Sequence, residues 1–187
     1  ASQYLGGYYA VVESLARLVA IGSDLNKIRL SFQEFYESLD KDKAWSKPLK
    51  SLLGAFEVSS YFQTPPIGGK DSMSGTFENI TVPPTLISFA VTTEDIENII
   101  TNDLKGEGKI GLIKTPYKED GTLDLGKLKD NFLKINREIR SGNIISAVAL
   151  SRKGLLTDIY EQAVGNTGFR IDYDNLYNPM FGSFVVE

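Results

Sequence analysis

The stretch "PPIGGKDSMSG" occupies residues 65–75 and lies between two strongly apolar segments. It offers almost no bulky apolar side chain to a core. Gly68, Gly69 and Gly75 can adopt a positive φ, and glycine lets a backbone approach a ligand closely. Successive N–H groups in such a turn can form a concavity that binds an anion. The backbone therefore predicts a phosphate-binding loop between a helix and a strand.

The side chains of the same stretch agree with that interpretation. Lys70 supplies a positive charge for a phosphate, and Ser72 and Ser74 supply hydroxyl donors. Asp71 could hold a metal ion or orient Lys70. The alternative is a solvent-exposed glycine turn with a Lys–Asp pair, which would contribute at most about 1 kcal/mol. The spacing matches neither a P-loop nor a dinucleotide fingerprint, so both interpretations stay open.

The amino-acid composition excludes several kinds of catalytic and metal-binding site. The 187 residues include no histidine and no cysteine, which excludes Ser-His triads, thiolate nucleophiles and His or Cys metal ligands. Carboxylates, Lys, Arg, hydroxyls, backbone N–H groups or an oxygen-bound cation such as Mg²⁺ remain. The formal net charge of −4 makes nucleic acid a poor partner, and no apolar run approaches the roughly 20 residues of a membrane span. Phosphate handling is favoured.

Apolar periodicity and turn residues predict interleaved helices and strands. The expected helices are 4–20, 42–62, 93–104, 123–142 and 154–166, and the expected strands are 27–35, 85–92, 109–116, 143–150, 169–174 and 183–187. The polar run "KGEGK" (105–109) is the expected seam between two domains. The fold class is therefore α+β, with α/β as the alternative, and helices cover the sheets.

Three helices have a face that should be buried. The expected apolar positions are Val11, Leu15, Leu18 and Val19 in the first, Leu49, Leu52, Leu53 and Phe56 in the second, and Leu125, Leu128, Phe132, Ile135 and Ile139 in the third. Gly22 and Gly142 are expected helix ends. Pro48 can occupy the first turn of the second helix. Strand 85–92 is apolar enough to be buried.

Two further positions are candidate sites. Glu13 lies beside the apolar stripe of the first helix. It is either a ligand for Mg²⁺ on a nucleotide or a boundary glutamate that pairs with Arg17 one turn later. The segment "LSRKG" (150–154) joins a strand to a helix, where N–H groups and basic side chains can receive an anion. An ordinary strand-to-helix turn is the alternative.

A set of motifs occurs in a characteristic order: "YAVVESLARLVA", "KIRLSFQEF", "PPIGGKDSMSG", "VPPTLISFAVT", "NIISAVALSRKGLL" and "NPMFGSFVVE". In this order the chain resembles phosphoribosylformylglycinamidine synthase, the glutamine- and ATP-dependent ligase of purine biosynthesis. The likeness is to the long single-chain form of clostridia and related bacteria. It covers essentially all 187 residues, and "GKDSMS" is its specific core.

The resemblance implies a fragment of the second aminoimidazole-ribonucleotide-synthetase-like (PurM-like) unit. Residues 1–104 would be the latter part of an N-terminal domain, and residues 110–187 the truncated beginning of a C-terminal domain. Such units pair their sheets in a barrel-like interface and bind ligands in clefts between domains. A fragment would expose an apolar sheet face, so self-association is expected. Implied ligands and partners are formylglycinamide ribonucleotide, ATP, Mg²⁺ and a glutaminase domain in the same cytoplasmic parent.

The resemblance also implies roles for individual residues. Glu13 matches a glutamate of a magnesium–nucleotide site, and Ser151 matches a serine that contacts the nucleotide. Two other oxygen ligands are replaced, by Arg17 in place of an asparagine and by Ala149 in place of an aspartate. The loop would face the ligand cleft, with the phosphate ligands Gly68, Gly69, Lys70, Asp71, Ser72 and Ser74.

Three functions are compatible with these features. The first is a piece of the ligase, inactive when isolated. The second is a structural half whose degraded nucleotide site stabilises the assembly, as the Arg17 and Ala149 replacements suggest. The third is another superfamily member, such as a thiamine-monophosphate or selenophosphate-forming kinase-like enzyme, against which "GGKDSMSG" argues.

Overall fold

A three-stranded sheet organises one part of the chain. In the computed structural model, which describes residues 2–106, 108–165 and 168–187, β1 (Arg29–Phe35) is the central strand. It pairs in parallel with β2 (Pro66–Ser72) and antiparallel with β5 (Thr85–Val91). A small hairpin of β3 (Thr76–Phe77) and β4 (Ile80–Thr81) lies between β2 and β5 in the chain.

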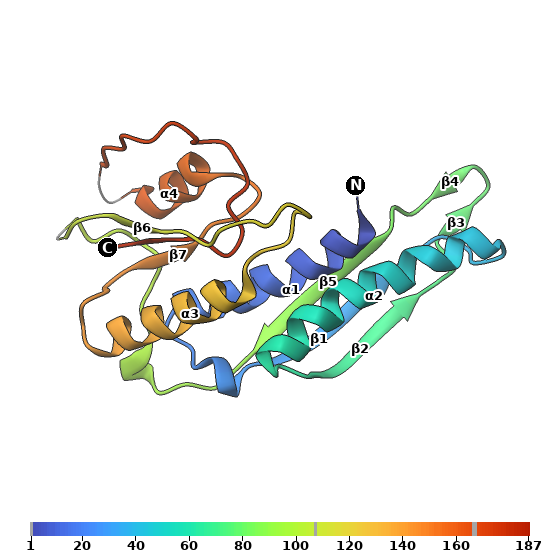
Figure 1. The fold of residues 1–187 in the computed structure, drawn as a ribbon, viewed down its shortest axis with the longest axis horizontal. Coiled ribbons are helices and arrows are strands. Elements are labelled where there is room, and N and C mark those ends of the chain that lie inside the picture. The colour runs from blue at the N-terminus through green and yellow to red at the C-terminus, as the bar shows by residue number, and fades with distance from the viewer. Residues whose placement is uncertain (1, 107, 166–167) are drawn as a thin grey trace. The chain divides into compact units, whose positions relative to one another are not determined.

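Two helices cover one face of this sheet (Figure 1). They are α2 (Asp42–Phe62) and the part of α1 (Gln3–Ala20) that ends at residue 14. A hydrogen bond of 2.8 Å between the hydroxyls of Ser14 and Ser88 joins α1 to β5. The other face is open, because Ile87, Phe89 and Val91 keep 39%, 53% and 55% of their side chains exposed. The strand predicted at 85–92 therefore exists, but it is half-exposed and not buried.

Close packing of α1 and α2 depends on glycine. A Cβ atom on Gly54 would overlap the carbonyl oxygen of Tyr4, and one on Gly7 would overlap that of Ser51. The helix backbones therefore touch, and α2 turns small residues toward the interior. The buried residues of α2 are Ala44, Pro48, Ser51, Gly54, Ala55, Val58, Ser59 and Phe62.

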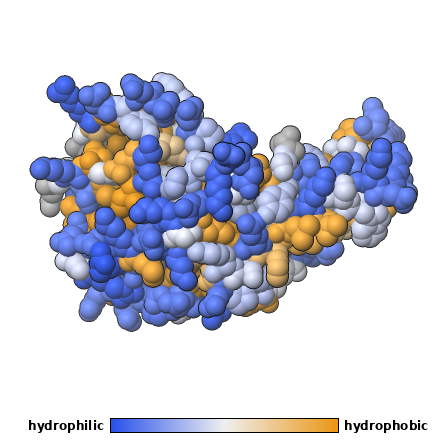
Figure 2. All heavy atoms as spheres, viewed as in Figure 1, coloured by the Kyte–Doolittle hydropathy of each residue, from blue (hydrophilic) through white to orange (hydrophobic). Residues whose placement is uncertain are grey.

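The predicted buried face of α2 is wrong. The four residues expected inside are 41–67% exposed: Leu49, Leu52, Leu53 and Phe56. Trp45 is also exposed on this helix, and Figure 2 shows apolar residues gathered over α2. We call these five residues the outer stripe of α2. Pro48 lies in the interior of the helix and not in its first turn.

A second sheet is built from three short strands, β6 (Gly111–Ile113), β7 (Ala147–Ala149) and β8 (Phe184–Val186). β8 lies in the middle and is antiparallel to both neighbours. Neighbouring residues of β8 point to opposite faces. Phe184 makes an edge-to-face contact with Phe132 of α3 (Leu125–Arg140), at 5.9 Å between ring centroids. Val185 packs on the other side, against α4 (Leu155–Ala163).

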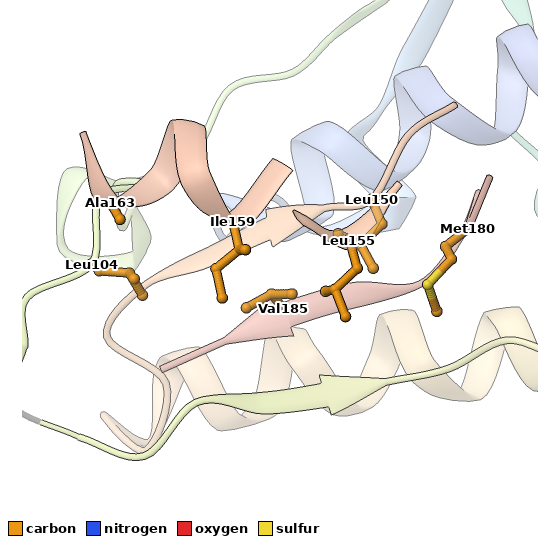
Figure 3. Packing of buried hydrophobic residues seen from close by; sticks show 7 residues of the cluster. All are labelled: Leu104, Leu150, Leu155, Ile159, Ala163, Met180 and Val185. Carbon is orange, nitrogen blue, oxygen red and sulfur yellow. The ribbon is translucent and has the colours of Figure 1, made fainter. Parts of the chain in front are cut away.

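The α4 side of this sheet carries a compact apolar core, shown in Figure 3. Its side chains come from segments far apart in the sequence: Leu104, Leu150, Leu155, Ile159, Ala163, Met180 and Val185. All are at most 7% exposed. Burial of an aliphatic side chain stabilises a fold by about 1.5–3 kcal/mol, so this cluster is a main source of stability for the second sheet.

The predictions for α3 are confirmed. All five expected apolar residues of α3 are buried, the Asp124 side chain accepts the N-capping hydrogen bond from the Lys127 amide, and Gly142 has a φ of +72°. In α1, Val11, Leu15 and Val19 are buried and Leu18 is partly so. The helix ends at Ala20, and Gly22 follows with a φ of +107°.

Other predicted elements differ from the structure. Residues 169–174 form no strand, and the helix expected at 93–104 is reduced to a single 3₁₀ turn, Ile96–Asn98. A second 3₁₀ turn spans Leu25–Lys27. The predicted helix 154–166 corresponds to α4, and its last residue, Asn166, lies outside the described residues.

The contacts divide the chain into two units. The first contains residues up to 14 and 28–91, and the second contains 15–27 and 92–187. The proposed seam at 105–109 lies within the second unit, and its Glu107 lies outside the described residues. The Glu187 carboxylate accepts hydrogen bonds there from the amides of Lys105 (2.6 Å) and Gly108 (3.2 Å). Among the described helices, none is long and apolar enough to span a membrane.

Candidate functional site

Most of the stretch 65–75 is a strand and not a loop. Residues 66–72 form β2, and none of Gly68, Gly69 and Gly75 has a positive φ. At two of these positions glycine is required because any larger residue would collide with a neighbouring atom. A Cβ on Gly69 would lie 2.6 Å from the Phe32 carbonyl oxygen, and one on Gly75 would overlap the Val82 side chain. The loop conformation predicted for this segment is therefore wrong, and β2 is instead an exposed strand at the sheet edge.

The strand separates Lys70 from Asp71. Lys70 is paired with Gln33 and Asp71 with Glu34. Paired residues share a sheet face and successive residues alternate, so Lys70 lies on the open face and Asp71 on the face that the helices cover. Asp71 is therefore not placed to orient Lys70. Ser72, two residues after Lys70, shares the open face, and Ser74 lies beyond the end of β2.

A buried polar pair lies beside Asp71 and was not predicted. The Tyr36 hydroxyl donates to Glu34 Oε1 over 3.1 Å, and both residues are buried. Burial raises the pKa of Glu34, the hydrogen bond from Tyr36 opposes the rise, and the Asp71 charge adds to it. Burial also raises the pKa of Tyr36 to about 12. The alternation of Leu30, Phe32, Glu34 and Tyr36 was the available sequence signal for this burial.

The second unit contains a half-open pocket of about 480 Å³. The last turn of α1, β7, the turn at 150–154 and one side of α4 supply its walls. Its polar lining residues are Arg17, Asn102, Ser151, Lys153, Asp158 and Glu161. Pockets that hold small ligands span roughly 300–1,000 Å³, so the volume suits a nucleotide-sized molecule. The predicted anion-binding segment 150–154 thus forms part of a pocket wall.

Asp158 and Ser151 hold the turn between β7 and α4. The buried Asp158 carboxylate accepts hydrogen bonds from the Ser151 amide (2.8 Å) and from the Ser151 hydroxyl (3.0 and 3.1 Å). The Ser151 oxygen in turn accepts from the Lys153 amide at 3.1 Å. Burial raises the pKa of Asp158, and the hydrogen bonds from Ser151 oppose that rise. Because its proton is directed to Asp158, the Ser151 hydroxyl in this arrangement positions Lys153.

Two cations face the pocket. Lys153 forms an ion pair with Glu161 at 2.6 Å, in which both side chains are about half exposed. This hydrogen bond is the main cause that raises the pKa of Lys153, while the Arg17 charge acts in the opposite direction. Arg17 and Lys153 line the same pocket. The arrangement suits an anion that replaces or shares the Glu161 carboxylate.

The residues present do not fit a magnesium site. Glu13 is half-buried on α1, and Arg17, one turn later, carries a guanidinium that cannot coordinate a cation. Ala149 lines the pocket with a methyl group. Within residues 2–106, 108–165 and 168–187, no three acidic side chains gather as metal ligands. We therefore derive no magnesium chemistry from this chain.

Comparisons with known proteins agree with this architecture. No family model matches the chain. The PurL subunit of phosphoribosylformylglycinamidine synthase from Methanobrevibacter smithii is 27% identical over 197 residues, which cover 94% of this chain and 27% of that protein. PurL of Thermotoga maritima complexed with ATP superposes with a TM-score of 0.65 at 19% identity, over 98% of this chain and 29% of that one.

The chain resembles PurL in sequence and in fold. Its α+β fold is the one shared by these PurM-like proteins. Another structure of T. maritima PurL is complexed with FGAR, and its TM-score is 0.63 at 18% identity over 98% of this chain and 28% of that one. Hydrogenase maturation protein HypE in complex with ATP has a TM-score of 0.63 at 13% identity, over 96% and 62%. The PurL-like chain spans between a quarter and a third of the PurL proteins it matches.

Proposed function

We propose that the chain is part of an enzyme that converts formylglycinamide ribonucleotide, glutamine and ATP into formylglycinamidine ribonucleotide. The observation that carries this proposal is the match to PurL along 94% of the chain in sequence and 98% in fold. PurL structures with ATP and with FGAR name the two ligands. The "GKDSMS" segment at the edge of the first sheet agrees with it.

The reaction requires activation of an amide oxygen. In the proposed mechanism, ATP phosphorylates the glycinamide carbonyl oxygen of the substrate, and ammonia released from glutamine by a glutaminase domain or subunit displaces the phosphate and leaves the amidine. Positive groups that stabilise the developing charge on the transferred phosphoryl group would supply much of the rate. As in purine synthesis generally, we place this enzyme in the cytoplasm. The remaining residues of the parent enzyme and any magnesium ligands would lie outside this chain.

The first unit contributes Lys70 and its neighbours in this proposal. Lys70 and Ser72 lie on the open face of the sheet, where they can contact the same phosphate, with the amides of Gly68 and Gly69 nearby and Ser74 at the strand end. Asp71 lies on the opposite face and has no direct part in phosphate binding. Ser151 acts by holding the turn on which Lys153 lies, and Glu13 precedes Arg17 by one turn of α1.

Lys70 provides the test. In the complete protein that contains this chain, Lys70→Met removes one phosphate cation, so we expect kcat/KM for formylglycinamidine ribonucleotide synthesis to fall about 10²-fold, as when one preorganised donor is lost. Lys50→Met, on the exposed side of α2, is the matched control and should leave the rate unchanged. Equal rates for both variants would remove Lys70 from the site. Absence of this synthesis in the unaltered complete protein would refute the proposed function.

A second candidate function is a structural half with no chemistry of its own. Arg17 and Ala149 favour it, because neither can coordinate a metal. Titration of the complete protein with Mg-ATP separates the two: one bound nucleotide supports the structural half, and two support a second competent site. In either case the 187-residue chain alone should show no ATP-dependent turnover with formylglycinamide ribonucleotide and glutamine.

A further inference from the structure

We propose that the pocket lined by Arg17 and Lys153 binds a phosphate group directly, with no divalent metal ion. This rests on the proposed function only for the choice of phosphorylated probes. A magnesium-bridged phosphate site uses one or two carboxylates that are free to bind the ion, and the two carboxylates that line this pocket already accept hydrogen bonds from Ser151 and Lys153. A direct site needs cations that face one cavity, and the pocket has two.

The two carboxylates that line the pocket, Asp158 and Glu161, already have hydrogen-bond or ion-pair partners. Both oxygens of Asp158 accept hydrogen bonds from Ser151, which turns this carboxylate toward the 151–154 turn. Glu161 binds Lys153. Removal of Glu161 from that ion pair is therefore the step that frees Lys153 for a ligand, and Glu161 competes with any bound phosphate.

Arg17 and Lys153 line the same cavity, and the Arg17 charge opposes the rise in the pKa of Lys153 that Glu161 causes. Two like charges that line one half-open cavity repel, and a dianion between them relieves this repulsion. The Asp158–Ser151–Lys153 chain of hydrogen bonds fixes the backbone that carries one of them. The turn is therefore organised before a ligand binds, which reduces the ordering that binding requires.

The apolar side of the pocket indicates what else the ligand carries. Leu18, Ile21 and Val148 line it beside the cations, and Asn102 adds an amide. A base or a sugar could occupy this part, so the shared chemistry is a phosphate ester, either from a nucleotide or from a sugar phosphate. ADP and ribose 5-phosphate distinguish the two sources, and pyrophosphate measures the phosphate contacts alone.

Calorimetric titration of the 187-residue chain in EDTA tests the proposal. We expect at least one of the three probes to bind, and Mg²⁺ in place of EDTA should not strengthen binding. Arg17→Met and Lys153→Met should each weaken binding about tenfold, the loss expected for one charge-assisted hydrogen bond. Arg152→Met, an exposed neighbour outside the pocket lining, is the matched control and should bind as the unaltered chain does.

Glu161→Gln gives a test in the opposite direction. It removes the competing carboxylate from Lys153, so binding should tighten severalfold, a gain that a purely structural role of the pair does not produce. Tighter binding of ADP than of ribose 5-phosphate assigns the site to a nucleotide, and the reverse assigns it to a sugar phosphate; either supports the proposal. Three results would overturn the proposal: binding that requires Mg²⁺, binding that neither cation variant affects, or no binding of any probe. A requirement for Mg²⁺ would still leave the proposed reaction intact.

Discussion

Helices α2 and α3 both have an apolar stripe at helical spacing, but only the stripe of α3 is buried. In α3 the apolar stripe is buried against the second sheet, with Phe132 only 1% exposed. In α2 the corresponding stripe faces outward, with Phe56 67% exposed, and small residues fill the interface with α1. Periodicity therefore identifies a face that favours burial, but the partner within the same chain decides whether that face is covered.

The largest expected effect contrasts two phenylalanines. Phe132→Ala removes a ring packed on Phe184 and should lower the free energy of unfolding by about 3–5 kcal/mol. Phe56→Ala, on the outer stripe of α2, should change it by less than about 0.5 kcal/mol. Urea denaturation of both variants measures the difference. Similar losses at the two positions would mean that the outer stripe is buried in solution.

The next effect concerns the small-residue interface of α2. Gly54→Ala forces a methyl group against the Tyr4 carbonyl, so overpacking should cost about 1–3 kcal/mol. Gly6→Ala is the control, since no atom lies within 4 Å of the added Cβ. It should stabilise α1 by about 0.5–1 kcal/mol through helix propensity. A neutral Gly54→Ala would show that α1 and α2 do not pack backbone to backbone.

A third contrast separates the ion pairs of the two helices. Arg140 at the end of α3 and Lys27 both bind Glu94, whose side chain is 2% exposed, at 3.2 and 3.0 Å. On α2, Lys47 pairs with Glu37, which is 24% exposed. The Lys27 hydrogen bond is the main cause that lowers the pKa of Glu94 from 4.5 to about 2.

A lowered folded pKa means that the unfolded state binds more protons as the pH falls, so Glu94 stabilises the fold above pH 4.5 and this contribution disappears between pH 4.5 and about 2. Urea midpoints measured from pH 6 to pH 3 should therefore fall more steeply for the unaltered chain than for Glu94→Gln. Glu37→Gln should follow the unaltered chain closely, since exposed pairs contribute little. Parallel curves for all three would contradict the assignment.

The smallest expected effect on stability comes from the outer stripe itself. Leu52→Lys with Phe56→Lys should leave the urea midpoint nearly unchanged, because both side chains are already exposed. If the stripe causes the expected self-association, sedimentation velocity should show less association for this variant. Phe89→Lys, on the open face of the first sheet, is the comparison. A decrease only with Phe89→Lys would assign the association to the sheet and not to α2.

The sequence correctly predicted those helices and strands whose buried face and ends follow from local apolar periodicity and turn residues. The α3 stripe, the capping glycines and strands such as β1 followed from periodicity and from turn residues. The face of α2 could not be predicted, because the glycines that bring α1 close contribute no hydrophobic signal. β2 was also missed: prolines and glycines disfavour strands, and only the backbone of β1 makes this one form.

In the candidate site, too, local sequence predicted some of the residues, and tertiary structure alone brings in the others. The junction at 150–154 was predicted as an anion site from its place between a strand and a helix and from its basic residues, and it does line a pocket. Arg17, Asp158 and Glu161 join it only through tertiary structure, because they lie on other turns and on another helix. The expected group of Lys70 and Asp71 failed for a simpler reason: a loop was assumed where strand alternation sends neighbours to opposite faces.

The pairing of β2 with β1 shifts by one residue near its start, where Leu30 is paired with Pro66 but Ser31 with Gly68. Ile67 is the residue skipped. Loss of that one codon would make Pro66 and Gly68 consecutive and remove the bulge, so Lys70 would stay paired with Gln33 and Asp71 with Glu34. The bulge therefore lets this edge strand lose one residue by a codon deletion while the ammonium and the carboxylate keep their own sides of the sheet.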